Sequence, residues 1–231
     1  MNVRCTPAKS THDIVTDFDA IAIALESGPP RDTLSDAERA LLRHVRTGAQ
    51  SAVDVGCGDG VFARALARRG SNVLAIDLSP RMIGLAQART PSDLRIQYRV
   101  ADIMTEPLPS QAYDVVVSIN VVHHVPLTQI VPRLADAVAP GGMLLIQDVV
   151  HRPNARYLVV NVAAALEIRA LRFLRRVPAN PVVAALYEKH GQGEVYLTPD
   201  EVAGAYASML PGARVEHHLQ WRYSIIWRRS P

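Results

Sequence analysis

The chain has 231 residues, of which 48% are hydrophobic, 20% are charged and 5% are aromatic, and its formal net charge is +3. This length suits one α/β domain with an elaboration, and the mild positive charge does not by itself indicate a nucleic-acid-binding protein. Cys5 and Cys57 are too few and too far apart for a disulfide framework or a metal-binding cysteine pattern. The amino-terminal stretch has no apolar signal core, and the most apolar segment, residues 157–166, is much shorter than the about 20 residues of a membrane-spanning helix. We therefore expect a cytoplasmic protein without an integral membrane segment.

Two amphipathic helices are predicted before the first strand. Apolar residues recur at helical spacing over residues 12–25, and a serine-glycine-proline-proline stretch at residues 27–30 ends that pattern. Ser35 then begins a second helix, with Glu38 three residues later completing a capping box, and this helix runs to about residue 46. We expect the two helices either to close over a ligand site or to cap one edge of the sheet.

A strand, three glycines at alternate positions and a helix form the stretch around which the chain is organised. Residues 52–55 are a short apolar run typical of a buried strand, and an alanine-rich helical pattern covers residues 61–70. The glycines allow positive φ and a close approach to a ligand, which is typical of the opening of a nucleotide-binding βαβ unit. Val61 stands where a dinucleotide-binding G-x-G-x-x-G motif needs its third glycine, and the absence of a following Lys-Ser/Thr pair excludes a P-loop.

The glycine turn has the pattern D-x-G-x-G-x-G, which resembles motif I of the class I S-adenosylmethionine-dependent methyltransferases. The resemblance implies that S-adenosyl-L-methionine is the cofactor. It also implies that Asp54 lies near the charged methionine end of the cofactor and that the backbone of the turn packs against it. The turn residues assigned to the cofactor site are Gly56, Cys57 and Gly58. A tight turn without a ligand is the alternative interpretation.

The second predicted strand, residues 72–77, ends in an acidic residue about 20 residues after the glycine turn. A carboxylate at the position of Asp77 can accept hydrogen bonds from both ribose hydroxyls of a bound nucleoside. Leu78 follows and can pack on the adenine. The phrase from Ala75 to Met82 resembles the second motif of the same methyltransferase family. The alternative is that Asp77 is an ordinary carboxylate at the start of a helix.

The third and fourth predicted strands place further residues at the same edge of the sheet. Residues 94–100 are the predicted third strand, and the resemblance places Asp102 at the adenine amino group and Ile103 against the ring. Residues 113–119 are predicted to form the fourth strand, and their central run of three valines is expected of a parallel strand buried on both faces. Asn120 follows that strand and is assigned to the cofactor site, because ligands bind beyond the carboxyl ends of the strands in doubly wound folds.

His123 and His124 are the best-placed candidates for catalysis, since imidazole titrates near neutral pH. Methyl transfer is an in-line displacement at a sulfonium, and its leaving group is a neutral thioether. A base is therefore useful only where the nucleophile must lose a proton. The alternative is that the two histidines only shape the wall of the pocket. No metal site is predicted, because Asp148 is the one acidic residue evident near the ends of the fourth and fifth strands.

A long insertion is predicted after a helix at residues 127–139 and a fifth strand at residues 143–147. About 45 residues separate that strand from the next helix, which is too long for a plain connection in a compact domain. Residues 157–177 are predicted to form a long helix and residues 182–190 a shorter one. In the resembling family such an insertion forms a lid over the acceptor pocket. The insertion residues that we predict to face this pocket are Tyr157, Leu158, Asn161 and Tyr187.

The predicted fold is α/β, with a Rossmann-like doubly wound sheet of seven strands, mostly parallel and with the last strand antiparallel, and a helical lid insertion. Thr198 opens the last helix, and residues 213–219 and 222–228 are the closing strands. The chain is expected to be one methyltransferase domain, residues 1–231. Its four expected parts are the N-terminal helices (1–48), the cofactor-binding core (49–150), the helical lid insertion (151–197) and the C-terminal helix and strands (198–231).

The sequence predicts methyl transfer to an oxygen or nitrogen atom of a small-molecule acceptor, such as a secondary metabolite. After the fourth strand there is no N/D-P-P-Y/F motif of the kind found in enzymes that methylate nucleobase or glutamine-amide nitrogens, so no nucleic acid partner is expected. Two alternatives remain, namely a protein that uses the bound cofactor to assist a rearrangement and a noncatalytic partner subunit. A nicotinamide oxidoreductase is disfavoured by Val61. The acceptor's identity and the oligomeric state stay open.

Overall fold

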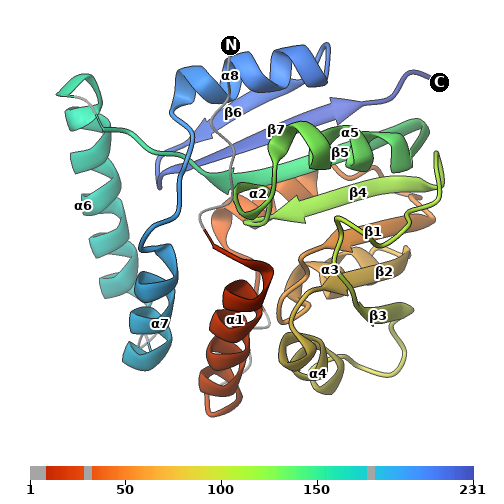
Figure 1. The fold of residues 1–231 in the computed structure, drawn as a ribbon, viewed down its shortest axis with the longest axis horizontal. Coiled ribbons are helices and arrows are strands. Elements are labelled where there is room, and N and C mark those ends of the chain that lie inside the picture. Colours follow the sequence, from red (N-terminus) through yellow and green to blue (C-terminus); the bar gives the residue numbers. More distant parts are fainter. Residues whose placement is uncertain (1–8, 29–32, 154, 176–179) are drawn as a thin grey trace.

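A single seven-stranded sheet forms the centre of the protein, and helices cover both of its faces (Figure 1). The computed structural model describes residues 9–28, 33–153, 155–175 and 180–231. Across the sheet the strands follow the order β3-β2-β1-β4-β5-β7-β6. Their bounds are Ser51–Val55 (β1), Asn72–Asp77 (β2), Ile96–Val100 (β3), Tyr113–Ile119 (β4), Val138–Val149 (β5), Arg214–His218 (β6) and Arg222–Arg228 (β7).

The pairing of the strands confirms the predicted fold. Strands β1 to β5 pair in parallel, whereas β7 runs antiparallel to both of its neighbours, β5 and β6. The direction of the chain's progress across the sheet reverses between β1 and β4. In doubly wound sheets, ligands bind in the crevice beyond the carboxyl ends of the strands at such a reversal. The glycine turn follows β1 and therefore lies at this crevice.

Eight α-helices surround the sheet in the described part of the chain, and polar caps define where several of them begin. The predicted capping box of Ser35 and Glu38 is present, and Thr198 and Glu201 form another. The α-helices are α1 (Thr11–Glu26), α2 (Asp36–Arg43), α3 (Val61–Ala67), α4 (Pro80–Ala88), α5 (Leu127–Ala137), α6 (Leu158–Arg175), α7 (Pro181–Gly191) and α8 (Pro199–Met209). The 3-10 turns are η1 (Val122–His124) and η2 (Ala155–Tyr157).

The core lies in two layers, one on each face of the sheet, because alternate residues of a strand point to opposite faces. In β4, Val116 belongs to the layer covered by α5 and α8, whereas Val115 and Val117 belong to the layer covered by α2 and α3. All three of these valines are at most 1% exposed. This double burial explains the continuous apolar run that predicted the strand.

The start of β5 differs from the prediction. The helix predicted for residues 127–139 ends at Ala137, and Val138 already pairs with Tyr113 as the first residue of β5. The register then shifts between Tyr113 and Val115. Gly141 has a φ of +73°, so the chain bends within β5 between the end of the predicted helix and the start of the predicted fifth strand.

Helix α1 lies between α4 and α7, and α6 lies on the outer side of α7 (Figure 1). Leu186 of α7 packs against an apolar cluster that includes Ile21 of α1 and Met82 of α4. The α7 part of the insertion is thus docked on the core through α1. Leu158 and Tyr187 are 61% and 48% exposed, so their predicted place against an acceptor stays a prediction. Among the described residues, no helix is long and apolar enough to cross a membrane.

Candidate active site

The glycine turn after β1 has the backbone geometry that the motif predicts. Gly56, Gly58 and Gly60 all have positive φ, at +73°, +52° and +76°. A Cβ atom added to Gly56 would lie 2.0 Å from Val121 Cγ2, so this glycine is required by close packing against the loop after β4. A Cβ atom added to Gly58 would meet nothing within 4 Å. The backbone at Gly58 therefore faces open space, which fits a ligand that lies against it.

Asp77 lies at the end of β2 and is held directly against this turn. Its Oδ2 atom accepts a hydrogen bond from the Gly58 N–H at 2.8 Å, and its Oδ1 atom accepts one from the Ser79 N–H at 2.9 Å. Burial raises the pKa of Asp77 above its usual value, although the same backbone donors act to lower it. Each carboxylate oxygen can accept more than one hydrogen bond, so both remain able to accept from ligand hydroxyls.

Asp54 is a buried carboxylate whose charge is poorly compensated by the protein. Asp54 is 2% exposed, and its Oδ2 atom has no hydrogen-bond partner in the described part of the chain. Burial, followed by the nearby Asp77 carboxylate, raises the pKa of Asp54 to about 8. A cationic ligand group beside this carboxylate would restore its charged form. Asp54 therefore fits the charged methionine end of S-adenosylmethionine.

The remaining predicted cofactor residues follow β3 and β4 at the same edge of the sheet. Asp102 is half-buried, its Oδ1 atom accepts from the Met104 N–H at 2.8 Å, and Ile103 is buried. Asn120 has a φ of +57°, and its side-chain oxygen accepts a hydrogen bond from Arg222 of β7. The structure thus brings the predicted set together along the carboxyl edge of β1 to β4.

His123 in η1 is held by a buried carboxylate at the end of β5. The Nδ1 atom of His123 lies 2.6 Å from Oδ1 of Asp148, and the backbone N–H of His123 donates to Oδ2 at 3.0 Å. The two side chains are 9% and 1% exposed. Burial acts to lower the pKa of His123, but the charge and hydrogen bond of Asp148 outweigh it and raise this pKa above its usual value.

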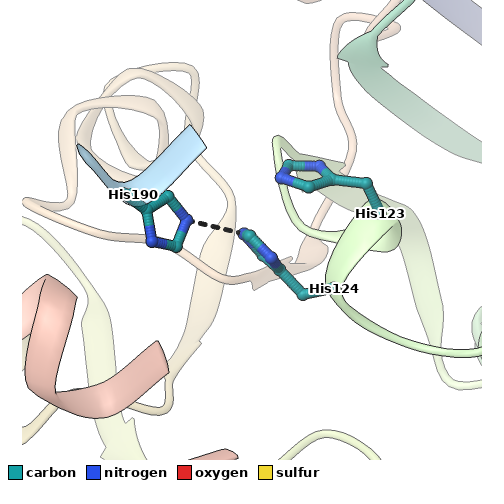
Figure 2. Close-up of side chains that lie close together, drawn as sticks. All are labelled: His123, His124 and His190. Atoms are coloured by element: carbon teal, nitrogen blue, oxygen red, sulfur yellow. Dashed lines mark hydrogen bonds between the residues drawn. The ribbon is translucent and has the colours of Figure 1, made fainter. Parts of the chain in front are cut away.

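His124 lies between His123 and a third histidine that the sequence analysis did not single out. Its Nε2 atom is 3.4 Å from Nε2 of His190 in α7, and its ring centroid is 3.8 Å from that of His123 (Figure 2). Burial, followed by the neighbouring His123 and His190, lowers the pKa of His124 to about 2. His124 is therefore neutral at any physiological pH.

Sequence reasoning missed several residues of this site. His190 and the carboxylates near its cluster lie on α1 and in the insertion, and no local motif connects them to the strand ends. The missed residues are Asp17, His190, Glu194 and Tyr196. His151, which follows β5 in the sequence, is exposed and lies outside the cluster. A hollow of about 520 Å³, lined by the first residues of β1, β2 and β4, lies at the opposite edge of the sheet from the glycine turn.

Comparison with known proteins identifies the family. Residues 53–146 match the family described as a methyltransferase domain. An uncharacterized methyltransferase of Mycobacterium tuberculosis (strain ATCC 25618 / H37Rv) is 32% identical over 191 residues, which cover 80% of this chain and 89% of the relative. The chain belongs to the class I S-adenosylmethionine-dependent methyltransferases. It is an enzyme of this family, and S-adenosyl-L-methionine is its cofactor.

Two further likenesses describe the breadth of this methyltransferase's family. The ubiquinone biosynthesis O-methyltransferase of Leptothrix cholodnii is 35% identical over 124 residues, and the match spans 52% of each protein. The Haemonchus contortus phosphoethanolamine N-methyltransferase 2, solved with phosphomonomethylethanolamine and S-adenosylhomocysteine, superposes with a TM-score of 0.69 at 16% identity. That superposition covers 98% of this chain and 61% of the other, and at this identity it shows the shared fold alone.

Replacing Asp54 with asparagine is expected to stabilise the ligand-free methyltransferase increasingly as the pH rises. The folded protein retains the Asp54 proton up to a pKa of about 8, whereas the unfolded chain releases it near 3.8. Between these values folding binds a proton, so the stability of the wild-type protein falls as the pH rises, and Asp54→Asn removes this loss. Each kcal/mol that the substitution adds to the free energy of unfolding raises the Tm by about 2–4 °C for a chain of this size.

Thermal unfolding of wild type and Asp54→Asn at pH 5, 6.5 and 8 measures this difference. Asp93→Asn is the matched control, because Asp93 is exposed. A Tm difference that does not grow with pH would show that Asp54 is charged in the free protein.

Proposed function

We propose that this methyltransferase methylates a hydroxyl oxygen or an amine nitrogen of a small molecule, and that His123 takes the proton that the nucleophile loses. The observation that carries the proposal is the 2.6 Å contact between His123 Nδ1 and Asp148 Oδ1, in which both side chains are at most 9% exposed. A histidine fixed by a carboxylate at the ligand edge of the sheet is suited to general-base catalysis.

Asp148 determines which nitrogen of His123 is available for chemistry. A carboxylate accepts hydrogen bonds, so Nδ1 carries the proton and Nε2 carries the lone pair. The second hydrogen bond, from the His123 backbone N–H to Asp148 Oδ2, fixes the backbone of His123. When bound, the cofactor supplies a methyl group on a sulfonium whose leaving group is a neutral thioether. The one proton that the protein has to handle is therefore that of the acceptor.

The cofactor is proposed to lie along the carboxyl edge of β1 to β4. Asp77 accepts from the ribose hydroxyls, and Asp54 faces the charged methionine end, in keeping with its unpaired and buried Oδ2 atom. Asp102 and Ile103 bind the adenine. The other proposed contacts of the cofactor are Gly56, Cys57, Gly58, Leu78 and Asn120.

His124 is proposed to shape the site rather than to transfer the proton. With its pKa lowered to about 2 by burial and by its histidine neighbours, it is a much weaker base than His123. Its ring packs against Phe18 of α1, with centroids 6.0 Å apart. His124 thus forms part of the wall between η1, α1 and α7.

The acceptor is proposed to be a small molecule because α1 and the insertion border the site on the chain itself. Helix α1 reaches the ligand edge, where Asp19 Oδ1 accepts from Ser79 Oγ at 2.5 Å. Tyr196, at the end of the proposed lid of residues 151–197, lies with its ring centroid 5.1 Å from that of His123. We propose that the chain works as one domain, that this lid selects the acceptor, and that nucleic acid is not a substrate.

Paired acceptors test this proposal. The purified enzyme is incubated with S-adenosylmethionine and phenols, catechols or amines, each beside its fully methylated counterpart, and S-adenosylhomocysteine is measured. We expect product with the free hydroxyl or amine and none with the methyl ether or the quaternary ammonium counterpart, because these have no free hydroxyl or amine group left to methylate. Transfer RNA and single-stranded DNA are tested as acceptors in the same assay. Turnover confined to nucleic acid or to carbon nucleophiles would contradict the proposal.

A further inference from the structure

Three histidines from two distant parts of the chain converge beside the proposed acceptor site (Figure 2). His123 and His124 lie in η1, and His190 is a buried residue in the last turn of α7, next to Gly191. One nitrogen from each residue lies within 4.8 Å of the corresponding nitrogens of the other two. Side-chain exposure is 9% for His123, 6% for His124 and 7% for His190, so the three imidazoles form a largely dry cluster.

Each imidazole has a carboxylate next to its Nδ1 atom. His123 Nδ1 is 2.6 Å from Asp148, His190 Nδ1 is 2.9 Å from Asp17 Oδ2, and His124 Nδ1 is 3.4 Å from Glu194 Oε1. Metal-bound histidines commonly carry this arrangement, in which a carboxylate holds one ring nitrogen and leaves the other for the ion. All three residues therefore have Nε2 as the nitrogen that is left for a ligand.

The pair formed by His124 Nδ1 and Glu194 Oε1 is the polar contact of this cluster that the protein leaves unsatisfied. The two atoms are 3.4 Å apart, and both are buried without a hydrogen-bond partner in the described part of the chain. The other contacts are made: Nδ1 of His190 lies 2.9 Å from Asp17 Oδ2 and 3.3 Å from Lys9 Nζ. The Nε2 atoms of His124 and His190 are 3.4 Å apart, close enough for one imidazole to donate to the other.

We propose that Nε2 atoms of His123, His124 and His190 bind one divalent transition-metal ion of the zinc class. An ion bound by Nε2 of His124 leaves the proton of that ring on Nδ1, from which it can be donated to Glu194. Neutral imidazole is a ligand that zinc prefers, and three histidines with an open fourth position are typical of catalytic zinc sites. The site goes beyond the proposed function and does not depend on it.

The spacing and the charge around the cluster fit such an ion. Two imidazole nitrogens bound tetrahedrally at about 2.0–2.1 Å from zinc are about 3.3–3.4 Å apart, which is the spacing observed for His124 and His190. Asp17, Asp148 and Glu194 supply three negative charges near the rings. Lys9, which donates to Asp17 at 2.7 Å, supplies one positive charge. Arg222, whose charge acts to lower the pKa of His123, supplies a second positive charge, so these groups leave one negative charge that attracts a divalent cation.

The ion would change the role of His123, because the lone pair of Nε2 cannot bind a metal and accept a proton at the same time. A hydroxyl in the fourth position would be more acidic, because the ion would stabilise the resulting anion, and water or buffer would have to take its proton while Nε2 of His123 is bound. The ion would also tie α7 to η1 and thereby hold the α7 part of the insertion on the core.

Titration of untagged, metal-free protein with Co²⁺ tests the site without any methyl acceptor. We expect one equivalent to bind with the visible absorption of a tetrahedral site and to be displaced by Zn²⁺. Asp17→Asn should lower the affinity for Co²⁺ by about 10–100-fold, which is the usual cost of changing a carboxylate behind a metal ligand. His124→Gln and His190→Gln should lower it further, because each removes a ligand. His217→Gln, at an exposed histidine of β6, should bind as the parent does.

The folding of each variant is checked by its metal-free Tm and by its affinity for S-adenosylhomocysteine. If His190→Gln does not fold, Asp17→Asn and the parent still decide the matter. Absence of the tetrahedral spectrum in the parent, or equal affinity in the parent and in the folded cluster variants, would overturn the metal site. If the protein binds no metal but methylates hydroxyl or amine acceptors, the metal site is wrong and the proposed function stands. If it binds the metal but methylates neither kind of acceptor, the proposed function is wrong and the metal site stands.

Discussion

His123→Gln is expected to lower kcat by about 10²–10⁴-fold while leaving the affinity for S-adenosylhomocysteine nearly unchanged. Glutamine is close to histidine in size and can hydrogen-bond, but it cannot accept a proton at neutral pH. The loss therefore falls on the step in which the acceptor is deprotonated. Asp148→Asn should lower kcat in the same direction, because His123 Nδ1 loses the carboxylate 2.6 Å away that fixes its tautomer.

The measurement is steady-state kinetics of S-adenosylhomocysteine formation, with a chelator present so that a bound ion does not substitute for the base. His12→Gln, at an exposed histidine of α1, is the matched control and should retain the parent kcat. His124→Gln should cost less than His123→Gln in this assay. A loss below about tenfold for His123→Gln would assign His123 to shaping the pocket, and a larger loss for His124→Gln would exchange the two roles.

Asp77→Ala is expected to weaken binding of S-adenosylhomocysteine by about ten- to a hundredfold, or roughly 1.5–3 kcal/mol, because ribose hydroxyls lose a charged acceptor in a partly dry site. The same change removes the acceptor of the Gly58 and Ser79 N–H groups, so a lower Tm is expected as well. Calorimetry at a temperature where the variant is folded separates the two effects.

The loss should depend on the ribose hydroxyls themselves. Adenosine should bind Asp77→Ala less tightly than the parent, whereas 2′,3′-dideoxyadenosine should bind both proteins equally. Asp93→Ala is the matched control, because it removes an exposed carboxylate. Unchanged affinity of folded Asp77→Ala for S-adenosylhomocysteine would remove Asp77 from the proposed cofactor site.

The sequence predicted the features that depend on short-range physics. A strand whose centre is buried on both faces carries consecutive apolar residues there, so the three valines at 115–117 made β4 recognisable. A turn that packs its backbone against Val121 and faces open space at Gly58 requires glycine, so the turn was recognisable from its spacing. Asp77 was found for the same reason, since its place at the end of β2 follows from the strand that carries it.

A local signal was insufficient where the outcome depended on hydrogen bonding between distant segments. The glycines at 141 and 142 lie between the predicted helix and the predicted fifth strand, but pairing of Val138 with Tyr113 extends β5 through them. A strand end is set by which neighbour offers its backbone groups, and the sequence near the end does not contain that information. The exposed Leu158 and Tyr187 are a similar case, because amphipathic spacing marks an apolar face without stating what covers it.

The histidine cluster was decided by tertiary structure alone. His123 and His124 were found because they follow β4, but His190 is 66 residues beyond His124 and belongs to no motif. Packing of α7 against α1 brings His190, Asp17 and Glu194 to η1, and that packing depends on the summed fit of many apolar side chains. The sequence by itself therefore determined the fold and the family, and it supplied the residues of the proposed cofactor edge, which are local to their strands. Only the tertiary structure determined which histidine faces Asp148 and which three imidazoles meet.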